Sequence, residues 1–256
     1  MSALDLAQLP LWAGRVMWVM ARVAGLFLAA PIFGATAVPA QVRIALVVLL
    51  TLVLVPLAPA SVDPLTVAGV VTLLEQVLVG GVIGFVLWLS FQAAAYAGQA
   101  IAQGMGLGFA ESVDPTGVGS SPSLGQFYLL LVTLLFLAMD GHLRLVALLA
   151  DSFRRLPPGT QALSLAGLHA VAAFGGELFL GAVRVALPAL TALLVVNMGF
   201  GAISRAAPSM NLFAVGFPIT LCLGFIALWL SLRSLPGAFE AVQDKAWSLM
   251  RVLAGG

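Results

Sequence analysis

The sequence predicts an all-α integral membrane protein, and two observations predict it: the composition and the long uncharged runs. Of the 256 residues, 62% are hydrophobic and only 8% are charged, and the mean hydropathy is +1.13. A soluble domain is about 45–50% apolar and about 25% charged, so this chain cannot coat its surface with solvated charge. Within hydrocarbon every backbone N–H and C=O group has to be paired inside its own segment, which leaves helices.

Seven apolar helices are expected from the uncharged runs, because a membrane span needs about 20 mostly apolar residues. They lie near 11–30, 41–58, 66–89, 90–110, 124–140, 163–204 and 211–233. The sixth is either one very long helix or a broken pair. Two further helices, near 142–155 and 238–253, are amphipathic. The second carries an apolar stripe at helical spacing, typical of an interfacial or docking helix: Phe239, Val242, Ala246, Leu249 and Leu253.

Prolines divide these runs into helical hairpins. Pro31 and Pro39 flank the first turn, whereas Pro188 and Pro218 lie inside apolar runs. An internal proline removes one helical hydrogen bond and kinks the helix. In a membrane such breaks are tolerated where protein or water satisfies the freed groups, so they predict packed, broken helices rather than lipid-exposed rods.

The distribution of positive charge predicts the orientation of the loops. Residues 142–161 and the C-terminal tail carry arginines and the single lysine, so both are expected to be cytoplasmic. Residues 60–66 and 98–123 carry acidic but no basic residues and are expected to face outward. An even number of crossings is then needed between 161 and 233, which two spans satisfy only if 163–204 is one helix with Arg184 along it.

The inventory of reactive residues argues against an enzyme, a cofactor and a metal site. The only lysine, Lys245, does not follow a glycine-rich loop, and the sequence has no Gly-x-Ser-x-Gly elbow. His142 and His169 are the only histidines, and a capping or loop role for His142 is favoured over metal ligation. The net charge is +1 without a basic block, so nucleic-acid binding is not expected.

A stripe of small residues recurs at every fourth position and predicts a close helix–helix seam. It comprises Ala94, Gly98, Ala102, Gly106 and Ala110, and Gly80 and Gly84 form a shorter version. A protein–protein assembly seam is favoured over the ordinary glycine richness of membrane helices. Four charged residues in or beside apolar runs are candidates for an ion path or for pairing with other subunits, and both alternatives stay open: Glu75, Glu177, Arg184 and Arg205.

Three stretches together resemble one protein family. They are residues 97–115, the segment from Asp140-Gly141-His142 to Gly159, and residues 186–218, where Arg205-Ala206-Ala207-Pro208 precedes Asn211. In order, spacing and flanking hydropathy they are similar to the FliR/SctT family of type III secretion export-apparatus subunits, over essentially the whole chain. Asp140-Gly141-His142 favours the flagellar branch, although Asp140 stands where the family commonly has asparagine.

The resemblance implies a non-enzymatic core subunit of a hetero-oligomeric export gate in the bacterial inner membrane, within the flagellar basal body. The implied partners are FliP-like, FliQ-like and FlhB-like subunits, and unfolded flagellar proteins would leave through the enclosed pore. Residues 1–184 would be FliP-like and 185–256 a FliQ-like helical hairpin with an amphipathic C-terminal helix. Alternatives are the homologous virulence secretion system and, less favoured, a stand-alone secondary transporter or channel that uses Glu75, Glu177 and Arg184.

A pore for unfolded protein has to close to ions at rest, and apolar constrictions do so by excluding water. Gly104, Met105 and Phe109 are the candidates for this seal, with Met105 and Phe109 able to share a face. The alternative is that both side chains pack against neighbouring subunits. The matching motifs also supply candidate subunit contacts: Asp114, Pro115, His142, Arg205, Pro208, Asn211, Phe217 and Pro218.

Overall fold

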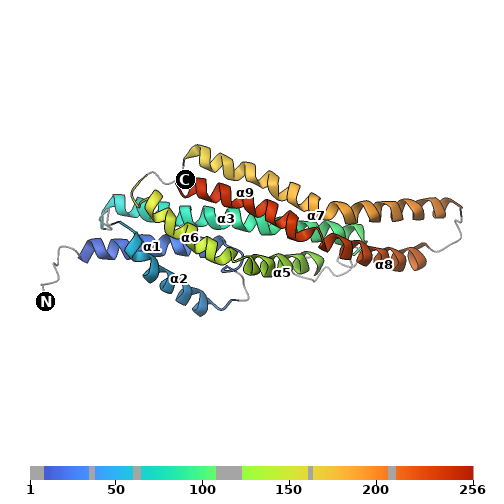
Figure 1. Ribbon diagram of the computed structural model, residues 1–256, viewed down its shortest axis with the longest axis horizontal. Helices are drawn as coiled ribbons and strands as arrows, with labels where there is room; N and C mark the ends of the chain where they lie inside the picture. The colour runs from blue at the N-terminus through green and yellow to red at the C-terminus, as the bar shows by residue number, and fades with distance from the viewer. Residues whose placement is uncertain are drawn as a thin grey trace. The chain divides into compact units, whose positions relative to one another are not determined.

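The computed structural model describes residues 9–34, 38–59, 65–107, 123–160, 164–206 and 212–255, and every regular element within them is helical (Figure 1). The all-α prediction is confirmed. The elements are α1 (Leu9–Ala29), α2 (Ala40–Leu54), the 3-10 turn η2 (Val55–Leu57), α3 (Val67–Gly104), α5 (Ser123–Ala138), α6 (Gly141–Arg155), α7 (Leu165–Ala206), α8 (Leu212–Leu232) and α9 (Leu235–Leu253).

The prediction of two helices at 66–89 and 90–110 was wrong, because a single helix, α3, covers Val67–Gly104 without interruption. Its sequence contains no proline, and its glycines are accommodated inside the helix. The helix also ends earlier than predicted, at Gly104. Likewise α7 is one helix of 42 residues that continues through Pro188, and α8 continues through Pro218. Of the two alternatives for 163–204, the single long helix is therefore the observed one.

Within the described ranges, four helices are long and apolar enough to cross a membrane: those containing Trp12–Ala29, Ala40–Leu57, Val67–Gly104 and Leu165–Ala206. Two further pairs qualify if each bent pair counts as one span. The α5/α6 pair bends by 66° and the α8/α9 pair by 52°. In both pairs an apolar helix is followed, after a short break, by an amphipathic one, as the sequence predicted for 142–155 and 238–253.

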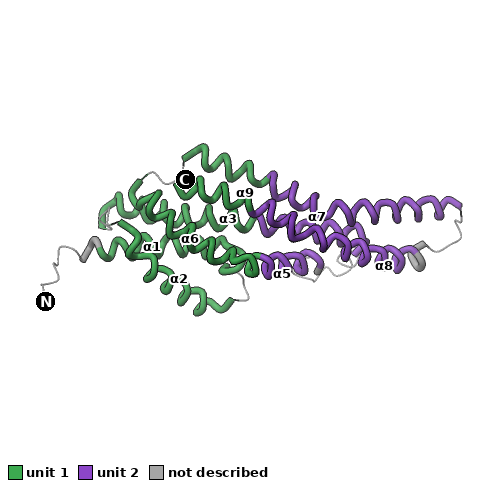
Figure 2. Tube along the Cα trace, in the orientation of Figure 1, with its two compact units in different colours: residues 1–89, 136–175, 244–256 green, residues 90–135, 176–243 purple. Residues whose placement is uncertain are grey.

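The described helices belong to two compact units, each assembled from separated stretches of chain (Figure 2). Unit 1 comprises 1–89, 136–175 and 244–256, and unit 2 comprises 90–135 and 176–243. The sequence predicted a FliP-like part up to residue 184 and a FliQ-like part from residue 185, a boundary that lies inside α7. The two units do not test this likeness to other subunits, so the division stays a prediction. The core of unit 1 forms where α1 meets the first part of α3, with Trp18, Val23 and Ile83 wholly buried.

Candidate functional site

The C-terminal end of α3, where the sequence places the pore seal, is fixed by a left-handed glycine. Gly106 has φ 81°, a conformation that residues with a Cβ rarely adopt. The Gly106 N–H donates to the carbonyl of Gln103 (3.0 Å) and the Leu107 N–H to that of Ala102 (3.0 Å). This pair of bonds is the Schellman motif that ends many helices. Gly106 is therefore a helix cap, and the expected helical register of the stripe through Gly106 was wrong.

A groove lies beside this cap within unit 2 and has a volume of about 430 Å³. Gln103, Gly104, Met105 and Gly106 line one side. The other side is formed by α7 and α8: Asn197, Phe200, Gly201, Ser204, Gly216, Phe217 and Thr220. The Met105 side chain is wholly buried and packs on α8, because a Cβ built on Gly224 would lie 2.5 Å from its Cγ. Met105 thus packs against another helix of the same chain, α8.

The described part of the small-residue stripe is also used inside unit 2. Ala94, Gly98 and Ala102 are buried, and a Cβ at Gly98 would lie 2.6 Å from the backbone oxygen of Leu124 in α5. The close approach that small residues predicted is therefore present, between α3 and α5 of the same chain. A seam with another subunit stays a prediction. Several predicted residues lie outside the described ranges: Phe109, Ala110, Asp114, Pro115, Pro208 and Asn211.

The remaining predicted contact residues lie on three helices. Arg205, in the last turn of α7, is exposed, as are Phe217 and Pro218 in α8. His142 is half-buried near the start of α6, and its Nδ1 is buried without a hydrogen-bond partner among the described residues. It does not cap the helix: the N-cap position is Asp140, which has a left-handed φ of 55° and makes no side-chain cap bond.

Of the charged residues considered for an ion path, none is fully buried. Arg184 is exposed on α7, and Glu75 and Glu177 are half-buried on α3 and α7. Among the described residues no group of three or more His, Cys, Asp or Glu is placed to hold a metal ion.

Among the charged residues whose burial the structure describes, the most deeply buried is Arg22 of α1, which the sequence analysis did not single out. Its Nε donates to Gln76 Oε1 (2.8 Å) and its Nη2 also contacts that oxygen. Nη1 donates to Ser152 Oγ (2.9 Å) and Nη2 to the carbonyl of Leu156 (2.8 Å). The guanidinium carbon lies 4.3 Å from the ring centroid of Phe153. Arg22 thus joins α1, α3 and the C-terminal end of α6 inside unit 1.

Every polar partner of Arg22 in the described structure is neutral, so hydrogen bonds and the aromatic face replace a counter-ion. Its planar guanidinium, with five donors, suits this role better than a lysine ammonium would. The signal in the sequence was an arginine in the middle of the apolar helix expected at 11–30, which also contains Arg15.

Two comparisons identify the family. The family model described as "Bacterial export proteins, family 1" matches residues 13–246, nearly the whole chain. The chain belongs to this family. Curated proteins are similar to this chain over most of their own length. The flagellar biosynthetic protein FliR of Pectobacterium carotovorum is 38% identical over 240 residues, 93% of this chain and 92% of that protein.

More distant relatives agree. FliR of Escherichia coli K12 is 36% identical over 89% of this chain and 87% of its own length, and FliR of Aquifex aeolicus is 31% identical over 82% of both. As a member of this export protein family, the chain is a membrane-spanning, non-enzymatic homologue of FliR in the flagellar export apparatus of the inner membrane. The predicted family, fold class and location are confirmed.

Proposed function

We propose that this chain forms part of the wall of a flagellar type III export pore, assembled with FliP-like and FliQ-like subunits and adjoining an FlhB-like subunit. Unfolded flagellar proteins would pass through that pore. The family membership supports an export role, and the helices supply the physical reason for assembly with other subunits.

The observation that carries the proposal is the mismatch between helix length and membrane thickness. At about 1.5 Å per residue, the 42 residues of α7 measure about 63 Å along the helix. The hydrocarbon core is about 30 Å thick, and a tilt of 40°, the upper end of the usual range, covers about 39 Å. More than a third of α7 therefore extends beyond the hydrocarbon core that could cover it.

Both ends of α7 nevertheless expose large apolar side chains. Leu165 and Leu168 are exposed near its start, and Met198 and Ile203 near its end. Contiguous exposed apolar surface marks interaction sites. Lipid can cover only one stretch of this helix, so the apolar remainder has to be covered by other protein, as in a hetero-oligomeric gate. A stand-alone transporter with spans of ordinary length would not need such cover.

The groove beside Met105 fits a seal of this pore. It lies at the capped end of α3, where Gly104 and Gly106 supply backbone without side chains, and it is lined by Phe200 and Phe217 as well as Met105. Met105 is unbranched and can adopt several shapes as neighbours change. In the assembled gate, Met105 and Phe109 would then face the constriction.

The test uses cells that lack their own copy of the gene and express the tagged chain. We expect the chain purified from membranes to bring FliP-like and FliQ-like subunits with it. A photo-reactive amino acid in place of Met198 should cross-link to one of those subunits or to an export substrate stalled by a folded fusion. The control carries the same probe in cells that lack the FliP-like subunit, where both cross-links should disappear.

Recovery of the chain alone or as a homo-oligomer would contradict the proposal and favour a transporter. The chain would instead belong to a virulence system if cells that lack the gene stayed motile but no longer secreted virulence proteins, and if the tagged chain still assembled with its partners. The curated flagellar relatives favour the flagellar outcome.

A further inference from the structure

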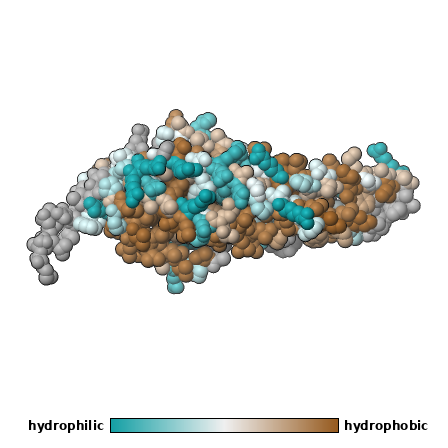
Figure 3. All heavy atoms as spheres, in the orientation of Figure 1, coloured by the Kyte–Doolittle hydropathy of each residue, from teal (hydrophilic) through white to brown (hydrophobic). Residues whose placement is uncertain are grey.

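A second groove lies within unit 1, between α6 and the C-terminal half of α9, and has a volume of about 320 Å³. Arg144 and Arg155 of α6 and Arg251 of α9 line it, together with the aromatic side chain of Trp247. Hydrophilic residues gather over these helices in the view of Figure 3, whereas much of the rest of that face is hydrophobic. Basic side chains of a chain with few charges are thus concentrated here.

The two helices that form the groove meet at their C-terminal ends. A Cβ on Gly255, at the end of α9, would lie 3.1 Å from the backbone carbon and oxygen of Arg155, so the ends of the two helices are in close contact. Gly255 has φ 89°, which favours glycine at this position. The carbonyl of Leu156, just beyond α6, already accepts a hydrogen bond from Arg22. One carbonyl acceptor at the C-terminal end of α6 is therefore engaged by Arg22 and not by an arginine of the groove.

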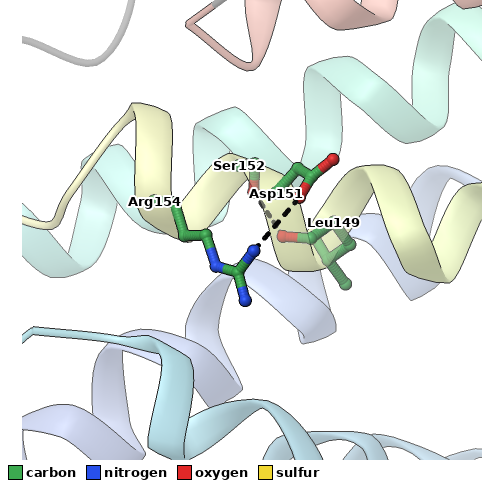
Figure 4. Close-up of polar contacts among 4 residues, drawn as sticks. All are labelled: Leu149, Asp151, Ser152 and Arg154. Carbon is green, nitrogen blue, oxygen red and sulfur yellow. Dashed lines mark hydrogen bonds and ion pairs between the residues drawn. The ribbon is translucent and has the colours of Figure 1, made fainter.

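The charges in the groove favour an anion. Among the described residues, Arg144 and Arg155 have no ion-pair partner. Asp151 also lines the groove, but its carboxylate lies 3.9 Å from Arg154, as Figure 4 shows on α6. Asp244 is the other acidic residue of the lining. Three guanidinium groups thus face two carboxylates, one of which is shared with Arg154.

The position of the groove in the fold favours a lipid as the source of that anion. Both of its helices are amphipathic and follow an apolar helix after a sharp bend, of 66° before α6 and 52° before α9. Amphipathic helices of this kind lie in the membrane interface. Arginine and tryptophan are side chains that anchor proteins at that level, and the basic residues of α6 and α9 predict the cytoplasmic side.

We propose that the groove between α6 and α9 binds the phosphate group of an anionic phospholipid of the cytoplasmic leaflet, with Arg144 and Arg155 as the principal ligands. Guanidinium groups bind phosphate oxygens through paired hydrogen bonds. Arg251 extends the positive surface, and Trp247 covers the adjoining glycerol and acyl region. This site is independent of the proposed pore function, since it concerns contact between the chain and its membrane.

The test measures lipid binding to the purified full-length chain by native mass spectrometry, with phosphatidylglycerol as the probe and phosphatidylcholine as the neutral reference. The site variant is Arg144→Gln with Arg155→Gln. The control variant, Arg184→Gln with Arg233→Gln, removes the same charge from exposed positions outside the groove. Each cation near an anionic lipid contributes about fivefold to affinity, so we expect phosphatidylglycerol binding to fall at least tenfold in the site variant only.

If the double variant does not fold, the single variants Arg155→Lys and Arg155→Gln are compared instead. Because Arg155→Lys keeps the positive charge, it should lose much less phosphatidylglycerol affinity than Arg155→Gln. Equal losses in the site and control variants, or equal binding of the two lipids, would overturn the proposal. Full competition by millimolar inorganic phosphate would show a soluble anion site, and binding only of an acidic peptide would show a protein partner. Either result would also overturn the lipid assignment.

Discussion

The two compact units bring their helices together through different kinds of contact, and their glycines show the difference. In unit 1, Gly25 and Gly80 lie where backbone meets backbone: a Cβ at Gly80 would lie 1.9 Å from the carbonyl oxygen of Arg22, and one at Gly25 2.3 Å from that of Val77. In unit 2, Gly181 and Gly224 instead face side chains. There are exceptions in both units: Gly98 and Gly125 of unit 2 face the backbone oxygens of Leu124 and Ala95, and Gly141 of unit 1 faces the ring of Phe136.

The polar contacts differ in the same direction. The centre of unit 1 is the charged Arg22 with its neutral partners. The buried polar pairs of unit 2 are neutral on both sides: Tyr128 Oη lies 2.6 Å from Ser231 Oγ, and Gln243 Nε2 donates to Ser90 Oγ (3.1 Å). Backbone cannot move aside locally, whereas a side chain can change rotamer. The α1–α3 contact of unit 1 is therefore less adaptable than the side-chain contacts of unit 2, which suits a part that anchors the chain. Unit 2, with the more adaptable contacts, contains the groove proposed as a seal.

The strongest test of this comparison is Gly80→Ala. The new methyl group would overlap the carbonyl of Arg22, so α1 and α3 have to separate along their contact, at a cost of more than about 3 kcal/mol. The adjacent Gly81 is the matched control, because its nearest atom would be 3.9 Å away. Gly81→Ala should be neutral or stabilising by about 0.5–1 kcal/mol, as expected for alanine in a helix.

Thermal unfolding of the purified chain in detergent, followed by circular dichroism, measures both Gly→Ala variants. If the two adjacent substitutions lowered the midpoint equally, backbone contact at Gly80 would not distinguish unit 1.

The next effect in size is expected from Arg22→Ala. It leaves Gln76, Ser152 and the carbonyl of Leu156 without their donor in a buried site and removes the contact with Phe153, which together should cost about 3 kcal/mol. Arg184→Ala, at an exposed position on α7, should change the stability by less than about 0.5 kcal/mol. The same unfolding experiment checks the pair, and a stable Arg22→Ala chain would show that the cluster does not hold α6 in place.

Much of this fold could be predicted from the sequence, because long apolar runs without charge leave helices as the only choice. The amphipathic stripe of α9 is a clear case: Phe239, Val242, Ala246 and Leu253 are all buried, and Leu249 is half-buried. The length of α3 could not be predicted, since span length gives a minimum and not a maximum. The seal candidates were expected within a helix running to residue 110, whereas α3 ends at Gly104 and Gly106 is a left-handed cap; their role in a seal stays a prediction.

Which helices contact each other could not be predicted from the sequence, for a different reason. Small residues predict that a helix is approached closely, but not by which helix, so Gly98 could not be assigned to α5. Arg22 was overlooked because an isolated arginine in an apolar run gives no sign of the neutral groups that gather around it. The burial of Met105 on Gly224 likewise depends on two segments more than a hundred residues apart.

The smallest effect is expected from Gly224→Ala, which tests the adaptable side of the comparison. A Cβ at Gly224 would lie 2.5–3.0 Å from the Cγ, Sδ and Cε atoms of Met105, and all three belong to a flexible side chain. Met105 can change rotamer, so the cost should be about 1 kcal/mol, well below that of Gly80→Ala.

Met105→Ala alone should cost about 2 kcal/mol or more through the cavity it leaves. In the double variant the new methyl group partly fills that cavity, so the combined loss should be smaller than the sum of the two single losses. A double-mutant cycle on thermal unfolding measures this coupling, and strict additivity would show that the two residues do not meet.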